Sequence, residues 1–263
     1  MIGFVEIFDE YPLNTRKSKE FMNNLFVPTI FVSIVYVILI FSIKKYMTLK
    51  KPLQLTGPLI IWNFSMALFS FIGTLATGYG LKKELSRSGF HGTFIVRGDF
   101  YGQNISGLFA FLFTMSKFVE LGDTIFLVLR KRPLIFLHWY HHILTLNYCI
   151  YNYPQDNAFN IWPNLINFLV HTIMYSYYML RAMHVKVPVW IAQNITTIQI
   201  AQFLFTLYIF SYVGLQRYKD VKIDAEFGGF WFGVLMEISY VYLFGKFFYD
   251  SYVKEGGSKK KQE

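Results

Sequence analysis

Residues 25–43 read LFVPTIFVSIVYVILIFSI, an apolar stretch without a charged side chain. A helix that crosses a bilayer needs about 20 mostly apolar residues, so this stretch predicts a transmembrane segment. It has about the full length of a span, and the N-terminus shows no short apolar core followed by a small-residue cleavage site. We therefore expect a membrane anchor and not a signal peptide that is removed.

The composition extends this reading to the whole chain. Of 263 residues, 54% are hydrophobic and 16% are charged, whereas a soluble domain carries about 25% charged residues. Six more stretches have the length and composition of spans: 58–78, 105–129, 134–153, 162–183, 188–212 and 227–249. We predict an all-α integral membrane fold with seven transmembrane helices. Its longest loop is expected at 79–104.

No internal repeat or long linker divides the chain. We predict an N-terminal lumenal segment at 1–24, one seven-helix catalytic domain at 25–250 and a basic cytosolic tail at 251–263. The formal net charge is +9, but no soluble basic domain exists to bind nucleic acid. Anionic lipid or an anionic substrate is the expected partner of this charge. A single cysteine, Cys149, excludes an internal disulfide framework.

An odd number of spans places the two ends of the chain on opposite sides of the membrane. We expect a cytosolic C-terminus, although basic residues on both sides make the positive-inside evidence only mildly favourable. The last residues include Lys260 and Lys261, which resemble a dilysine signal for retrieval to the endoplasmic reticulum. The alternative is a solvated basic tail. On the predicted lumenal side, Asn104 begins a glycosylation sequon.

Three histidines occur within five residues of the fourth predicted span, as His138-Trp139-Tyr140-His141-His142. On a helix, offsets of three and four place His138 beside His141 and His142. Imidazoles are costly in an apolar helix unless they are hydrogen-bonded or used. This cluster could supply a nucleophile, a base or metal ligands.

Other polar residues gather near the same depth of the predicted bundle. They are Lys117, Glu120, Asp123 and Thr124 in the third span, Asn167, His171 and Tyr175 in the fifth, and Thr196, Gln199 and Gln202 in the sixth. At 1.5 Å rise per residue, the acids, the histidines and Gln199 lie roughly 9–16 Å from the predicted cytosolic ends of their spans. A buried structural network or interhelical hydrogen bonding would explain each group alone.

Membrane di-iron desaturases and hydroxylases also use HxxHH boxes, together with further histidine boxes that hold two irons. This chain has six histidines, and four of them fall in one predicted site. That number argues against a di-iron centre. A single zinc or iron with Glu120 or Asp123 as a further ligand remains an alternative at this point. A seven-helix transporter or receptor with a proton relay is another, weakened by the lack of repeats.

Four motifs, in order between residues 117 and 202, resemble those of the ELO family of very-long-chain fatty acid elongases. They are KxxExxDT from Lys117, HxxHH from His138, NxxxHxxMYxYY from Asn167 and TxxQxxQ from Thr196. HxxHH alone is weak, but the ordered set is specific. The Trp139-Tyr140 filling resembles the branch that acts on saturated and monounsaturated acyl-CoAs.

The resemblance implies a 3-oxoacyl-CoA synthase in the endoplasmic reticulum membrane. It would condense a long-chain acyl-CoA with malonyl-CoA, releasing CO2 and CoA, as the first step of fatty acid elongation. No cofactor or metal is implied. Helices 2–7 would form a barrel-like bundle around an acyl tunnel. Expected partners are 3-oxoacyl-CoA reductase, 3-hydroxyacyl-CoA dehydratase, enoyl-CoA reductase and other elongase copies.

In that reaction we expect His141 to be the nucleophile and His171 an acid, base or oxyanion partner. The rival mechanism uses a histidine only as a general base. His138 and His142 would orient and tune His141. Gln199 and Gln202 could donate to the thioester or malonyl carbonyl. Glu120 and Asp123 would fix histidine tautomers, with Lys117 balancing their charge or binding malonate. Thr124, Asn167 and Tyr175 are expected to orient or bind substrate. Arg130, Lys131, Arg132, Arg181 and Lys186 would hold CoA phosphates. Cys149 is expected to pack and not to react.

Overall fold

The computed structural model describes residues 3–254, and all regular secondary structure in that range is helical. The α-helices are α1 (Thr15–Thr48), α2 (Thr56–Gly92), α3 (Ile105–Glu120), α4 (Gly122–Leu129), α5 (Phe136–Asn152), α6 (Ile161–Ala182), α7 (Val189–Tyr218) and α8 (Phe227–Phe248). Short 3-10 turns cover Val5–Phe8, Tyr153–Gln155 and Ala158–Asn160, and a π-helical turn covers Tyr249–Val253. The predicted all-α class is confirmed.

Four helices are long and apolar enough to cross a membrane: α1, α2, α7 and α8 with its π-helical extension. The outer face of α1 exposes large apolar side chains, among them Phe31, Val35 and Ile38 at 64%, 61% and 61%. Such a face is unfavourable in water and suits lipid. The chain is therefore a multi-pass membrane protein.

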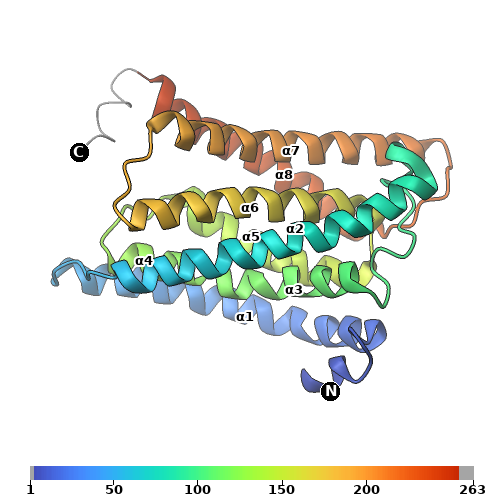
Figure 1. The fold of residues 1–263 in the computed structure, drawn as a ribbon, viewed down its shortest axis with the longest axis horizontal. Coiled ribbons are helices and arrows are strands. Elements are labelled where there is room, and N and C mark those ends of the chain that lie inside the picture. Colours follow the sequence, from blue (N-terminus) through green and yellow to red (C-terminus); the bar gives the residue numbers. More distant parts are fainter. Residues whose placement is uncertain (1–2, 255–263) are drawn as a thin grey trace.

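Six helices close a ring. α2 contacts α3, α3 contacts α5, α5 contacts α8, α8 contacts α7, α7 contacts α6, and α6 returns to α2. α1 lies outside this ring and packs on α4 and α5 (Figure 1). The links at 49–55, 130–135 and 183–188 lie at one end of the bundle, and those at 93–104, 153–160 and 219–226 lie at the other (Figure 1).

The loop predicted at 79–104 was wrong over its first half, because α2 continues from residue 78 to Gly92, with a kink at Gly89, whose φ is +70°. The continuation is amphipathic: Leu81 and Glu84 are buried, while Lys82 and Lys83 are exposed. Charged residues lower the apolar count of such turns without ending the helix. Likewise, α1 begins at Thr15, ahead of the predicted 25, and Asn14 caps it by accepting a hydrogen bond from the Lys17 backbone N–H at 3.0 Å.

The third predicted span, 105–129, is interrupted at Leu121, between α3 and α4. Gly122 begins α4 directly against Trp62 of α2: a Cβ at Gly122 would lie 2.6 Å from the Trp62 ring. The absence of a side chain at Gly122 therefore lets the start of α4 approach α2 closely.

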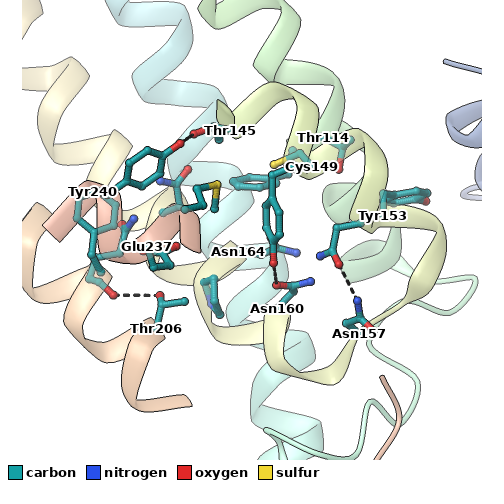
Figure 2. Close-up of a pocket in the computed structure, with 18 of the residues that line it drawn as sticks. Thr114, Thr145, Cys149, Tyr153, Asn157, Asn160, Asn164, Thr206, Glu237 and Tyr240 are labelled. Atoms are coloured by element: carbon teal, nitrogen blue, oxygen red, sulfur yellow. Dashed lines mark hydrogen bonds between the residues drawn. The ribbon is translucent and has the colours of Figure 1, made fainter. Parts of the chain in front are cut away.

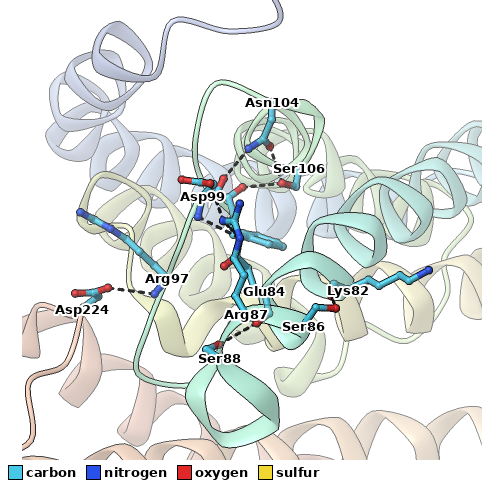
Figure 3. A network of polar contacts seen from close by, with 11 residues as sticks. Lys82, Glu84, Ser86, Arg87, Ser88, Arg97, Asp99, Asn104, Ser106 and Asp224 are labelled. Carbon is cyan, nitrogen blue, oxygen red and sulfur yellow. Dashed lines mark hydrogen bonds and ion pairs between the residues drawn. The ribbon is translucent and has the colours of Figure 1, made fainter.

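A buried carboxylate holds the loop that follows α2 (Figure 3). The Glu84 side chain is 3% exposed, and it accepts hydrogen bonds from the Asp99 backbone N–H at 3.1 Å and from Arg87 at 3.2 Å. Gly98 has φ +52°, and a Cβ there would lie 1.8 Å from Glu84 Oε2. Both the conformation and the space at position 98 therefore require glycine.

Asn104 stabilises the other end of this loop through two side-chain hydrogen bonds (Figure 3). Its side-chain oxygen caps α3 by accepting from the Gly107 N–H at 2.9 Å, and its amide nitrogen donates to the Asp99 carbonyl at 2.6 Å. The amide nitrogen is the atom that a glycan would occupy. Glycosylation of Asn104 stays a prediction, and it would replace one of the two hydrogens on this nitrogen.

Gly98→Ala should destabilise the protein, because an alanine Cβ overlaps the Glu84 carboxylate and a left-handed conformation costs a non-glycine residue about 1 kcal/mol or more. Thermal unfolding in detergent measures the effect as a lower midpoint. Gly57→Ala is the matched control, because nothing lies within 4 Å of its Cβ. Equal midpoints for the two variants would contradict this account of the loop.

Candidate active site

A cavity of about 80 Å³ lies inside the helix ring. Its wall is formed by residues of α3, α5, α6, α7 and α8, and it extends from His141 to Asp156 at the end of the bundle that carries the 93–104 loop. Figure 2 shows polar side chains along much of its length, including Thr145, Asn160 and Glu237. This cavity, with a histidine at one end, is the candidate active site.

His141 is the one predicted catalytic histidine that lines this cavity. Its ring lies 4.7 Å from the Tyr240 ring and 5.9 Å from the Phe244 ring, measured between centroids. Its Nδ1 atom is buried and has no hydrogen-bond partner among the described residues. Tyr240 donates to the His141 backbone carbonyl at 3.2 Å. The helix is thus held in place while one ring nitrogen stays free for a ligand.

The other three predicted catalytic histidines surround His141 without lining the cavity. The rings of His138 and His142 are 4.7 Å apart, and those of His141 and His142 are 5.8 Å apart. His171 is buried on α6, and its Nδ1 lies 3.7 Å from Glu120 Oε1. The structure therefore brings the histidine box together and joins His171 to a carboxylate.

A buried ion pair connects α3 to the cavity wall. Lys117 Nζ lies 2.8 Å from Glu120 Oε1, and the two residues are 2% and 3% exposed. Ser116 also donates to Glu120, at 3.0 Å. Lys117 donates to Asn167 Oδ1 at 3.1 Å, and Asn167 lines the cavity. With its oxygen occupied, the Asn167 amide has its nitrogen left to donate.

Asp123 and Thr124 make different contacts from the ones expected. The two Asp123 oxygens accept hydrogen bonds from Trp62 Nε1 and from the Tyr175 hydroxyl, both at 2.6 Å. Thr124 hydrogen-bonds to the Tyr36 hydroxyl at 2.5 Å. In place of the expected pairing with a histidine, Asp123 links α4 to α2 through Trp62 and to α6 through Tyr175.

The three polar residues predicted on α7, Thr196, Gln199 and Gln202, make different kinds of contact. Gln202 lines the cavity, and its buried Oε1 has no partner among residues 3–254. Gln199 donates to Met174 Sδ at 3.4 Å, which ties α7 to α6. Thr196 donates to the Ala192 carbonyl of its own helix at 3.1 Å. Of these three residues, the structure places Gln202 at the site.

The predicted phosphate-binding residues share one end of the bundle. Arg130, Lys131 and Arg132 belong to the segment that joins α4 to α5, and Arg181 and Lys186 lie at the end of α6 and in the link to α7 (Figure 1). All are exposed except Arg130, which is partly buried. Lys131 donates to the Lys50 carbonyl at 3.1 Å. Lys260 and Lys261 lie outside the described residues.

A polar cluster closes the opposite end of the cavity. The Asp156 side chain pairs with Lys19 of α1, and its Oδ2 lies 3.5 Å from Arg97. Burial raises the pKa of the Asp156 carboxyl, although the hydrogen bond from Lys19 lowers it. Tyr101 adds a hydrogen bond to the Asn157 carbonyl at 3.3 Å. These contacts tie the first helix and two loops together where the cavity ends.

Cys149 lines the cavity as a buried free thiol. Within residues 3–254, no group of three His, Cys, Asp or Glu side chains is arranged to hold a metal ion. Several residues of the site were missed by sequence reasoning: Tyr36, Trp62, Asn160, Asn164, Glu237 and Tyr240. Glu237 could have been found from the sequence, because it is the one acidic residue in the span predicted at 227–249, and an acid inside a span often marks a functional site.

A family model described as ELO: GNS1/SUR4 family matches residues 21–260 of the chain. The chain belongs to the ELO family. The resemblance carried by the four motifs is thereby confirmed, and it covers nearly the whole sequence. His141, the ion pair and the cavity described above are thus features of an ELO protein.

Named relatives of this ELO protein include fatty acid elongases of worm and human. It is 42% identical over 261 residues to Long chain fatty acid elongase 1 of Caenorhabditis elegans, covering 98% of this chain and 90% of that protein. Identity to Long chain fatty acid elongase 2 of the same species is 37% over 257 residues, covering 96% and 93%. It is 35% identical over 244 residues to Very long chain fatty acid elongase 6 of Homo sapiens, covering 93% and 91%.

Lys117→Met should destabilise this ELO protein by about 3–5 kcal/mol, because it leaves the Glu120 carboxylate buried without its cation. The double variant Lys117→Met/Glu120→Met should regain most of that loss. Thermal unfolding in detergent measures both. Lys17→Met is the matched control, since the Lys17–Asp9 pair is exposed and its loss should change the midpoint far less. A double variant no more stable than Lys117→Met would refute the pairing argument.

Proposed function

We propose that this ELO protein is a very-long-chain 3-oxoacyl-CoA synthase. It condenses long-chain acyl-CoA with malonyl-CoA to 3-oxoacyl-CoA, CO2 and CoA, as expected of a fatty acid elongase. The geometric observation that carries the proposal is the free Nδ1 of His141 at the wall of an internal cavity. Family membership disfavours the desaturase, transporter and receptor alternatives.

His141 attacks the acyl thioester carbonyl. A C–N bond forms, the C–S bond breaks, and CoA leaves as a thiolate that takes up a proton. Malonyl-CoA then loses CO2, and the resulting enolate carbon attacks the acyl-imidazole. A C–C bond forms, the C–N bond breaks, and His141 is regenerated.

The neighbouring residues stabilise charge and position the imidazole. The amide nitrogens of Asn167 and Gln202 donate to the carbonyl oxygens that become negative during the reaction. His171, 3.7 Å from Glu120, serves as the acid or base on the side of α6. His142 positions the His141 ring through an edge contact, and His138 contacts His142 in turn. Asp123 fixes Tyr175 and thereby the position of α4.

The ring of helices is proposed to be the acyl tunnel. In this arrangement α3 with α4, α5 and α6 cross the bilayer in addition to the four long helices, which gives seven spans. The domain at 25–250 lies in the endoplasmic reticulum membrane, with the N-terminus lumenal and the basic tail cytosolic. The end of the bundle with Arg130, Lys131, Arg132, Arg181 and Lys186 faces the cytosol, where these cations bind CoA phosphates. The same proposal includes retrieval to the endoplasmic reticulum through Lys260 and Lys261. It also includes contact with the reductases and the dehydratase of the elongation cycle.

His141→Ala should lower condensation by a factor of about 10³ or more, because it removes the attacking nitrogen. Condensation is measured by incubating membranes that contain the variant with labelled malonyl-CoA and hexadecanoyl-CoA. Cys149→Ser is the matched control, with unchanged turnover expected from a thiol that only packs against the wall. Substantial turnover by a correctly inserted His141→Ala protein would contradict the assignment.

The covalent step predicts that acyl-CoA alone releases free CoA and leaves the acyl group on His141. Peptide mass spectrometry of the purified protein after incubation without malonyl-CoA detects that adduct. A histidine acting only as a general base gives neither product. Unmodified His141 together with intact acyl-CoA would therefore favour the rival mechanism.

A further inference from the structure

Unpartnered polar atoms gather on the cavity wall. Five buried side-chain N or O atoms in residues 3–254 lack a hydrogen-bond partner, and those of His141, Asp156, Gln202 and Glu237 belong to residues that line the cavity. Leaving such an atom unpaired in the interior of a protein is unfavourable. The proposed reaction engages His141 Nδ1, Gln202 has an amide nitrogen that can donate to a bound carbonyl, and Asp156 Oδ2 is paired with Lys19. Glu237 differs from them, because neither of its oxygens has a hydrogen-bond or ion-pair partner in residues 3–254 and the proposed reaction does not use it.

The position of Glu237 along the cavity follows from its neighbours on α8. A Cβ at Gly233 would lie 2.9 Å from the Tyr148 hydroxyl, and the Tyr240 hydroxyl lies 2.8 Å from Thr145 Oγ1. Since α8 packs along α5 in this register, Glu237 faces the stretch between Thr145 and Tyr148. That stretch lies four to seven residues past His141, or roughly 6–10 Å along the helix axis.

The group at this level is a buried carboxyl that has no hydrogen-bond partner in residues 3–254. Glu237 is 7% exposed, makes no ion pair within residues 3–254, and has a free Oε2. Nearby hydroxyl donors are already engaged, because Tyr148 donates to Asn160 at 3.0 Å and Thr206 donates to the Gln202 carbonyl at 3.0 Å. No lysine or arginine lines the described cavity. A neutral donor group on a bound molecule fits this arrangement.

We infer that Glu237 forms a subsite for a hydroxyl group on the acyl chain, so that hydroxylated long-chain acyl-CoAs are a substrate class of this protein. The inference rests on the proposed condensing function. A hydroxyl at the matching depth donates to Glu237 Oε2. A plain chain places methylene groups against an unpaired carboxyl oxygen, and a site built for a hydroxyl discriminates against a chain that lacks it.

The test uses the full-length protein in membranes with malonyl-CoA. Its substrates are hexadecanoyl-CoA and a series of hydroxyhexadecanoyl-CoAs in which the hydroxyl is moved stepwise along the chain. We expect kcat/KM to peak at one internal hydroxyl position, about tenfold above the plain chain. Glu237→Leu should abolish that peak and improve the use of the plain chain. Glu237→Gln keeps a hydrogen-bonding side chain and should retain the peak.

Glu226→Leu is the matched control, because Glu226 is exposed at the start of the same helix. It should behave like the wild type. A wild type that condenses all the chains equally overturns the inference and indicates a subsite that holds water only, while leaving the condensing function intact. A peak that survives in Glu237→Leu also overturns it. If no acyl-CoA is condensed at all, the proposed function itself fails. Should Glu237→Leu not insert, the wild-type series and Glu237→Gln still decide the outcome.

Discussion

Two opposite charges, Lys117 and Glu120, lie one turn apart inside an apolar ring of helices, and both are nearly inaccessible. Neither charge is stable there alone, because its desolvation is compensated only by the other and by hydrogen bonds. This requirement fixes the rotation of α3. It also fixes Asn167 on α6, whose oxygen accepts from Lys117, and places His171 beside Glu120. The polar part of the site is built outward from this pair.

The constraint extends from the ion pair to the end of the cavity that His141 lines. Asn167 lines the same cavity as His141 and Gln202, so the contact that neutralises charge also fixes the place of this amide on the cavity wall. In the proposed mechanism this amide donates to developing negative charge. Under that proposal, stability and catalysis depend on the same few contacts, and a change at α3 is expected to affect both.

The positions of the helices could be predicted from the sequence where a long apolar stretch marks the helix. The grouping of the motif residues could be predicted where helical spacing places them on one face. Sequence reasoning placed Lys117, Glu120, Asn167 and His171 at one depth, and the structure brings them into contact. It failed at the last turns of α2, because buried Glu84 and exposed Lys82 and Lys83 alternate there in a way that apolar counting reads as loop. The partners of Asp123 came from α2 and α6, and no spacing rule within one helix predicts such a pairing.

α1 outside the ring has a consequence for how the protein responds to its lipid. Asn147 of α5 donates to Ser33 of α1 at 2.8 Å, and the Trp139 and Phe41 rings lie 5.9 Å apart. The helix that carries the histidine box is therefore supported by protein on its outer side as well as its inner side. Changes in bilayer thickness or lateral pressure act first on the helices that contact lipid chains directly. Because α1 lies between the lipid and α5 on this side, we expect the position of His141 to depend little on the lipid composition of the membrane.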